Sequence, residues 1–265
     1  MTLFLENFEP KKSLFALLKL LHFWFPVALG WSIAQVVHRA TGIPLYSNGL
    51  ILFLAGIWAA YSLDRLTDEP TRQSRFLKIA LVSGLVAAVA LCAFSAAHLS
   101  LKTLSAVAVF SFLALLYRRL KKFPLLKTFI VALVWVWAGA ALSVKTDEWF
   151  GGDWWTMSAA IPLFLLIAAG CILCDLKDVE ADKKQNVRSL PVLFGVRRTV
   201  LIVMVLAGIA AVIAASQNRP GLLISSLTLI VFAQYPSILA VEDVGPLLVD
   251  FILTLPGILI AAKVV

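Results

Sequence analysis

The chain has 265 residues, of which 61% are hydrophobic and only 14% are charged, and its formal net charge is +8. Soluble domains carry roughly 25% charged residues, so this composition excludes an ordinary soluble protein and indicates a polytopic membrane protein. The basic residues cluster between apolar runs and form no stripe interleaved with aromatic residues, so a nucleic-acid partner is not expected.

Nine apolar segments, each near the roughly 20 residues that a bilayer demands, follow one another along the chain. They cover residues 14–36, 48–66, 77–97, 101–117, 127–144, 156–177, 198–215, 220–240 and 245–263. Only the short sequence AHLSLK separates the third segment from the fourth, which predicts a tight hairpin. We therefore expect an all-α transmembrane bundle of about nine helices, forming a single domain over residues 1–265.

The Lys and Arg residues predict how the bundle is oriented. If the N-terminus is cytoplasmic, 18 of the 23 basic residues fall on the cytoplasmic side. Cytoplasmic loops carry an excess of basic residues, so this bias supports nine spans and the orientation together. The expected location is a lipid bilayer, with a bacterial inner membrane as the specific prediction.

Two acidic segments lie at the ends of the second and sixth spans, on the predicted cytoplasmic side. The sequence DRLTD holds Asp64 and Asp68, and DLKDVEAD holds Asp175, Asp178 and Asp182. On a helix these spacings place the carboxylates on one face, where they repel one another unless a cation is bound. Mg²⁺ prefers carboxylate oxygens and commonly shares the phosphate oxygens of a substrate. The two segments together therefore predict a magnesium site facing a diphosphate, although either alone would fit a solvated helix end.

A family resemblance is carried by these segments and their neighbours. The sequence DLKDVEADKKQNVRSLPVLFG resembles the second aspartate motif of the UbiA family of intramembrane prenyltransferases, D-x-x-D-x-x-G-D followed by T-L-P-V-x-x-G. DRLTD resembles the family's first motif, N-x-x-x-D-x-x-x-D, and LYRRLKKFPLLK resembles its loop after the fourth span. With nine spans, the resemblance extends over nearly the whole chain.

The resemblance implies a Mg²⁺-dependent enzyme that transfers a prenyl group from a polyprenyl diphosphate to a lipophilic, commonly aromatic, acceptor. The implied metal ligands are Asp64, Asp68, Asp178 and Asp182, with Asp175 as a direct or indirect partner. The implied contacts to the diphosphate are Arg72, Arg75, Tyr117, Lys121 and Arg188, and Lys121 is also counted with the four aspartates as catalytic. Tyr117 could equally be an anchor at the membrane interface.

Three positions depart from the family pattern. Ala60 stands where the first motif has Asn, Tyr61 stands where an acid often follows it, and Ala181 replaces the glycine of the second motif. One metal ligand is therefore missing, which leaves open a non-catalytic or transport protein that binds a lipid diphosphate. A CDP-alcohol phosphatidyltransferase is disfavoured, because its D-x-x-D-G-x-x-A-R motif is absent.

Two further polar features lie inside apolar segments. Asp250 is near the start of the ninth span, and an intramembrane acid is by default a candidate functional residue unless it lies at the surface. Cys171 and Cys174 form a CxxC in the sixth span. A packing role is favoured for this pair, because no second CxxC completes a zinc site.

The charge bias generates a testable prediction about topology. In a variant whose native cysteines are replaced, single cysteines introduced near 70, 120 and 185 should be shielded from an impermeant thiol reagent in intact cells. A cysteine near 150 should react, because it lies on the outer side. Labelling of the 118–126 loop from outside would contradict the span count.

Overall fold

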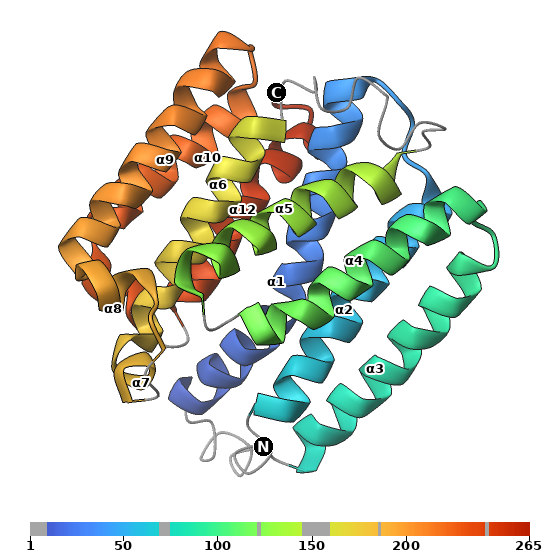
Figure 1. The fold of residues 1–265 in the computed structure, drawn as a ribbon, viewed down its shortest axis with the longest axis horizontal. Coiled ribbons are helices and arrows are strands. Elements are labelled where there is room, and N and C mark those ends of the chain that lie inside the picture. The colour runs from blue at the N-terminus through green and yellow to red at the C-terminus, as the bar shows by residue number, and fades with distance from the viewer. Residues whose placement is uncertain (1–9, 69–74, 121–122, 145–159, 185–186, 242–243) are drawn as a thin grey trace, which may run out of the picture.

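A computed structural model describes residues 10–68, 75–120, 123–144, 160–184, 187–241 and 244–265. Nine long helices make up most of these residues (Figure 1). They are α1 (Pro10–Thr41), α2 (Ser47–Asp68), α3 (Arg75–Ala96), α4 (Leu101–Leu120), α5 (Pro124–Ser143), α6 (Ala160–Cys174), α9 (Val196–Ser216), α10 (Pro220–Ala233) and α12 (Gly245–Ala261). Shorter helices are η2 (Asp175–Asp178), α7 (Val179–Lys184), α8 (Leu190–Phe194) and α11 (Pro236–Leu239).

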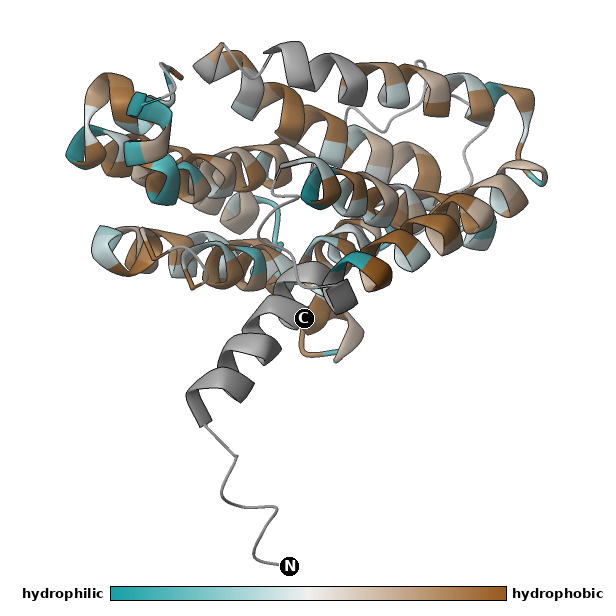
Figure 2. Ribbon diagram, turned by 90° about the horizontal axis from the view of Figure 1, so that it is seen from below, coloured by the Kyte–Doolittle hydropathy of each residue, from teal (hydrophilic) through white to brown (hydrophobic). Residues whose placement is uncertain are grey.

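The predicted all-α bundle is confirmed, with nine long helices over the described residues. Within them, the extended structure consists of one isolated bridge between Leu45 and Val144. Four described helices are long and apolar enough to cross a membrane, judged by length and composition: Ser47–Thr67, Lys78–Ala96, Ala160–Lys184 and Val196–Ser216. Figure 2 shows that hydrophobic residues dominate the long helices.

Two details of the predicted spans are wrong. The span predicted over 220–240 breaks after Ala233, and Pro236 begins the separate α11, because proline cannot continue a helix without losing a backbone hydrogen bond. The turn between α3 and α4 is short, as expected, but the helices diverge from it instead of forming a packed hairpin (Figure 1). Over the described residues, α3 packs mainly along α2, and α4 packs against α5.

Helix α6 lies in the interior of the bundle. It packs against α5, α9, α10 and α12, and most of its residues are buried. A helix that is hydrophobic all round belongs in the core of a bundle, and α6 carries no charged residue before Cys174. The core therefore holds α6 firmly up to the point where the second acidic segment begins.

Helix α12 packs closely along α1 through a proline and a glycine. Pro256 lies inside α12 and cannot donate a backbone hydrogen bond. The next backbone N–H, that of Gly257, donates to the Ser32 hydroxyl of α1 at 2.9 Å. In lipid every backbone N–H must find an acceptor within the protein, and a serine of a neighbouring helix is one of the usual partners near a proline. A side chain on Gly257 would clash with the Ser32 backbone.

This contact predicts that Gly257→Val destabilises the protein strongly. The added side chain would push α12 away from α1, and overpacking in a close interface costs about 1–3 kcal/mol or more. Thermal unfolding in detergent should show a clear fall in melting temperature. The matched control is Gly208→Val in α9, where an added Cβ meets no atom within 4 Å and should change stability much less. Equal effects of the two substitutions would contradict the close approach.

Candidate functional site

The first aspartate motif lies at the end of α2. The helix continues without interruption through Asp68, so Asp64 and Asp68 occupy one helical face, as predicted. Asp64 and Arg65 are exposed, and so is Ala60 one turn before Asp64. The Asp68 side chain lies outside the described residues. Since alanine offers no ligand, this face presents fewer oxygen donors than the family pattern does.

The second aspartate motif is not one regular helix. The α-helix α6 ends at Cys174, the 3₁₀-helix η2 covers Asp175–Asp178, and α7 follows. The helix that carries Asp175 and Asp178 is therefore a 3₁₀-helix and not an α-helix. Residues three apart are eclipsed in a 3₁₀-helix, so this tightening aligns the two carboxylates along one line. Asp175 is 5% exposed, and Asp178 and Asp182 are half-buried.

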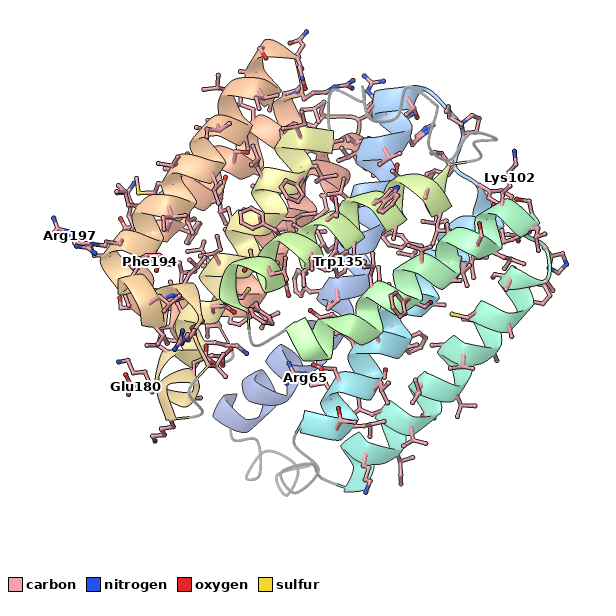
Figure 3. The ribbon with its side chains drawn as sticks, viewed as in Figure 1. Arg65, Lys102, Trp135, Glu180, Phe194 and Arg197 are labelled. Carbon is pink, nitrogen blue, oxygen red and sulfur yellow. The ribbon has the colours of Figure 1, made fainter. Side chains whose placement is uncertain are left out.

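One acid of this segment faces away from the others. Glu180 is exposed and pairs with Lys183 of the same helix at 3.0 Å. In Figure 3 its side chain projects outward from the lower end of the molecule. Glu180 is therefore a surface acid, whereas the side chains of Asp175, Asp178 and Asp182 are buried or half-buried.

The sequence SLPVLFG folds back beside the acidic segment. Ser189 precedes α8, is 3% exposed and has its hydroxyl buried without a hydrogen-bond partner in the described structure. Gly195 has a φ of 78°, a conformation that favours glycine, and its N–H donates to the Pro191 carbonyl at 3.0 Å. Helix α8 then packs against α9, α7 and η2. The SLPVLFG segment thus packs against the two short helices that carry Asp175, Asp178 and Asp182.

Both motifs lie at the same end of the bundle. In Figure 3, Arg65 of α2 and Glu180 of α7 lie toward the lower end, whereas Lys102 of α4 lies at the opposite end. Figure 1 shows the end of α2, the start of α3 and the short α7 and α8 at this lower end. The alternation of the spans therefore places two segments that are far apart in sequence at the same end of the bundle.

The predicted diphosphate contacts are only partly described. Arg188 is exposed immediately before Ser189. Arg75 begins α3 and Tyr117 is in α4, but their side chains lie outside the described residues, as do Arg72 and Lys121 entirely. These four positions remain predictions from sequence.

Asp250 of α12 connects the two motif helices. It interacts electrostatically with Tyr61 of α2, with Cys174 at the end of α6 and with Lys177 of η2. Sequence reasoning singled out Asp250 but found no partner, because the partners lie on three other elements, α2, α6 and η2. The only sequence feature that pointed to Asp250 was its position as the single acid of the apolar segment 245–263.

The donor set fits a hard divalent cation bound together with phosphate. Among the described residues, no three His, Cys, Asp or Glu side chains gather closely enough to bind one ion by themselves. Mg²⁺ is usually bound by one or two carboxylates, with water and phosphate oxygens completing its shell. The aligned Asp175 and Asp178, one of them buried, supply carboxylates in that number.

Three comparisons with known proteins bear on this arrangement. The model of the UbiA prenyltransferase family matches residues 77–243, which is well over half of the chain. A search of curated protein sequences finds no match.

Two solved structures share the fold. The apo structure of a UbiA homolog from Aeropyrum pernix K1 superposes with a TM-score of 0.63 at 17% sequence identity, covering 90% of this chain and 96% of that one. The structure of a UbiA homolog from Archaeoglobus fulgidus bound to Cd²⁺ gives a TM-score of 0.53 at 19% identity, covering 92% and 96%. With the match to the family over residues 77–243, these findings show that the chain is a multi-pass membrane protein that belongs to the UbiA prenyltransferase family.

Proposed function

We propose that this protein is a Mg²⁺-dependent prenyltransferase that moves a prenyl group from a polyprenyl diphosphate to a lipophilic acceptor. The observation that carries the proposal is the convergence of two aspartate segments at one end of an apolar bundle. The family supports prenyl transfer in general terms. An apolar bundle suits a hydrocarbon tail, and the acidic end suits a metal-bound diphosphate.

A divalent cation is supported by the donor set and by one relative. The structure of the Archaeoglobus fulgidus homolog contains Cd²⁺. We assign the cation here to Asp175, Asp178 and Asp182 of the second segment and to Asp64 and Asp68 of the first. When bound, Mg²⁺ would neutralise the negative charge that develops on the departing diphosphate.

The protein's own residues would bind and orient the substrates. Arg72, Arg75, Lys121 and Arg188 would hold the phosphates, because basic groups fixed near a leaving group stabilise charge as it appears. Tyr117 would orient a phosphate oxygen. The bond between the allylic carbon and the diphosphate oxygen breaks, and the acceptor attacks that carbon with loss of a proton.

The orientation belongs to the same proposal. A cytoplasmic N-terminus places the acidic end, with most of the basic residues, on the cytoplasmic side. We assign the protein to a bacterial inner membrane on this basis.

Ala60 and Tyr61 favour a second candidate, a non-catalytic protein that binds a lipid diphosphate. Both positions lack the ligand that the family pattern supplies, so the end of α2 carries only Asp64 and Asp68 as acids. Binding could then persist without turnover. The two candidates make different predictions in one assay.

The deciding experiment incubates the purified protein in liposomes with isotope-labelled geranylgeranyl diphosphate, Mg²⁺ and a panel of phenols, hydroquinones and lipid alcohols. Mass spectrometry should detect a prenylated acceptor that disappears when EDTA is added. Magnesium-dependent binding of the diphosphate with no product from any acceptor would support the non-catalytic candidate and contradict prenyl transfer.

The weakened first motif predicts unequal roles for the two aspartate segments. Asp178→Ala should lower turnover at least tenfold more than Asp64→Ala, a difference of roughly 1.4 kcal/mol in transition-state stabilisation. The reason is that the second segment supplies more of the cation's ligands. Ala60→Asn should lower the Mg²⁺ concentration needed for half-maximal activity. Equal losses from Asp64→Ala and Asp178→Ala would mean that both segments bind metal fully.

Lys121 is predicted to stabilise the leaving diphosphate. Lys121→Gln should reduce turnover about tenfold, or roughly 1.4 kcal/mol, as well as affinity, because negative charge grows as the bond breaks. Lys122→Gln is the matched control and should stay near wild type, since either substitution leaves the basic excess of the loop intact. If the two variants have the same activity, Lys121 contributes only to the excess of basic residues that sets the membrane topology.

A further inference from the structure

Asp250 is a carboxylic acid within α12 that neither aspartate motif includes. The helix begins at Gly245, so at a rise of about 1.5 Å per residue Asp250 lies about 7.5 Å along it. Its side chain is only partly exposed. An acid at such a position in an apolar helix is costly and is retained where it serves a site.

On one side, Asp250 lies against the end of α6. Helices α6 and α12 approach closely at Gly170, where an added Cβ would come within 2.7 Å of Leu253 and 3.1 Å of Val249. Cys174 is one turn beyond Gly170, toward the acidic segment, and interacts electrostatically with Asp250. The close packing of α6 and α12 at Gly170 and the electrostatic interaction of Cys174 with Asp250 therefore agree.

On the other side, Asp250 reaches α2 across α1. Phe251 packs edge-on against Phe25 of α1 with ring centroids 6.4 Å apart. The adjacent Trp24 packs against Trp58 of α2 at 5.3 Å. Tyr61 is three residues after Trp58, so it lies on the same face of α2, and it interacts electrostatically with Asp250.

The groups that surround Asp250 come from three elements. Asp250 interacts electrostatically with Tyr61 of α2, Cys174 of α6 and Lys177 of η2. Tyr61 and Cys174 interact in turn with Arg65, Cys171 and Asp175. They do not form a metal site by themselves, since no three acid, thiol or imidazole groups among the described residues gather around one point.

The depth of this cluster relates it to the proposed reaction. Tyr61 precedes Asp64 by three residues, and Cys174 precedes Asp178 by four, so these two neighbours of Asp250 lie on the membrane-inward side of those two aspartates. If the diphosphate is bound at the motifs and its tail extends into the bundle, the allylic carbon lies at the level of Asp250. A proton acceptor at that level would be within reach of an attacking acceptor.

We propose that Asp250 is the proton acceptor for a hydroxyl-bearing lipophilic substrate and that the Tyr61 hydroxyl orients this substrate. The inference rests on the proposed function and names the class of acceptor.

The C–O bond of the prenyl diphosphate breaks, and its electron pair leaves with the diphosphate. The new bond joins the allylic carbon to the acceptor oxygen, or to the ring carbon that the hydroxyl activates. The hydroxyl proton passes to the Asp250 carboxylate. If the ring carbon attacks, the hydrogen on that carbon then moves to the oxygen and restores the hydroxyl and the aromatic ring.

The test separates binding from transfer with labelled geranylgeranyl diphosphate and a hydroquinone or alcohol that wild type prenylates. Asp250→Asn keeps the shape of the side chain but cannot take a proton, so transfer should fall about a hundredfold or more. Mg²⁺-dependent binding of geranylgeranyl diphosphate, measured by tryptophan fluorescence, should be unchanged. Asp250→Glu should recover part of the activity, and Tyr61→Phe should raise KM for the acceptor more than it lowers kcat.

Glu180→Gln is the matched control, because it makes the same acid-to-amide change in an exposed residue paired with Lys183. It should transfer at the wild-type rate. The inference is overturned if Asp250→Asn transfers as fast as wild type, or if it loses diphosphate binding and stability in proportion to activity. A wild-type protein that neither binds the diphosphate nor forms product would overturn the proposed function itself.

Discussion

The structure depends on placing carboxylates at the edge of an apolar bundle without burying them as unpaired charges. A buried, unpaired charge costs several kcal/mol, so acids at the end of a core helix must meet water, a cation or a protein partner. Helix α6 solves this by ending its regular hydrogen bonding at Cys174 and tightening into η2 as the first acid appears. Helices α7, α8 and α11 pack against that short irregular segment.

The long helices were predictable from the sequence because their apolar runs match the thickness of a bilayer. The starts of α10 and α12 and the ends of α2 and α3 fall within two residues of the predicted limits. The errors arose where tertiary packing decides the outcome. Pro236 was included in a span although it begins α11, and the divergence of α3 from α4 depends on which neighbour each helix packs against.

The candidate site was predictable in its residue types but not in its local shape. A spacing of three or four residues identifies acids on one helical face, yet it cannot distinguish an α-helix from a 3₁₀-helix at Asp175 and Asp178. The surroundings of Asp250 could not be predicted for a similar reason. Its neighbours Tyr61 and Lys177 are brought to it by the packing of α12 against α1 and α6, which no spacing within one segment encodes.

The hydrogen bond from Gly257 to Ser32 has a consequence for how α12 can move. A helix in a bundle of smooth apolar side chains could slide along its axis at little cost, and each residue of slip shifts its side chains by about 1.5 Å. The bond, formed where Pro256 interrupts the backbone ladder, pins α12 to α1 in a single register. The position of Asp250, less than two turns away on the same helix, is thereby set by the register of α12 against α1.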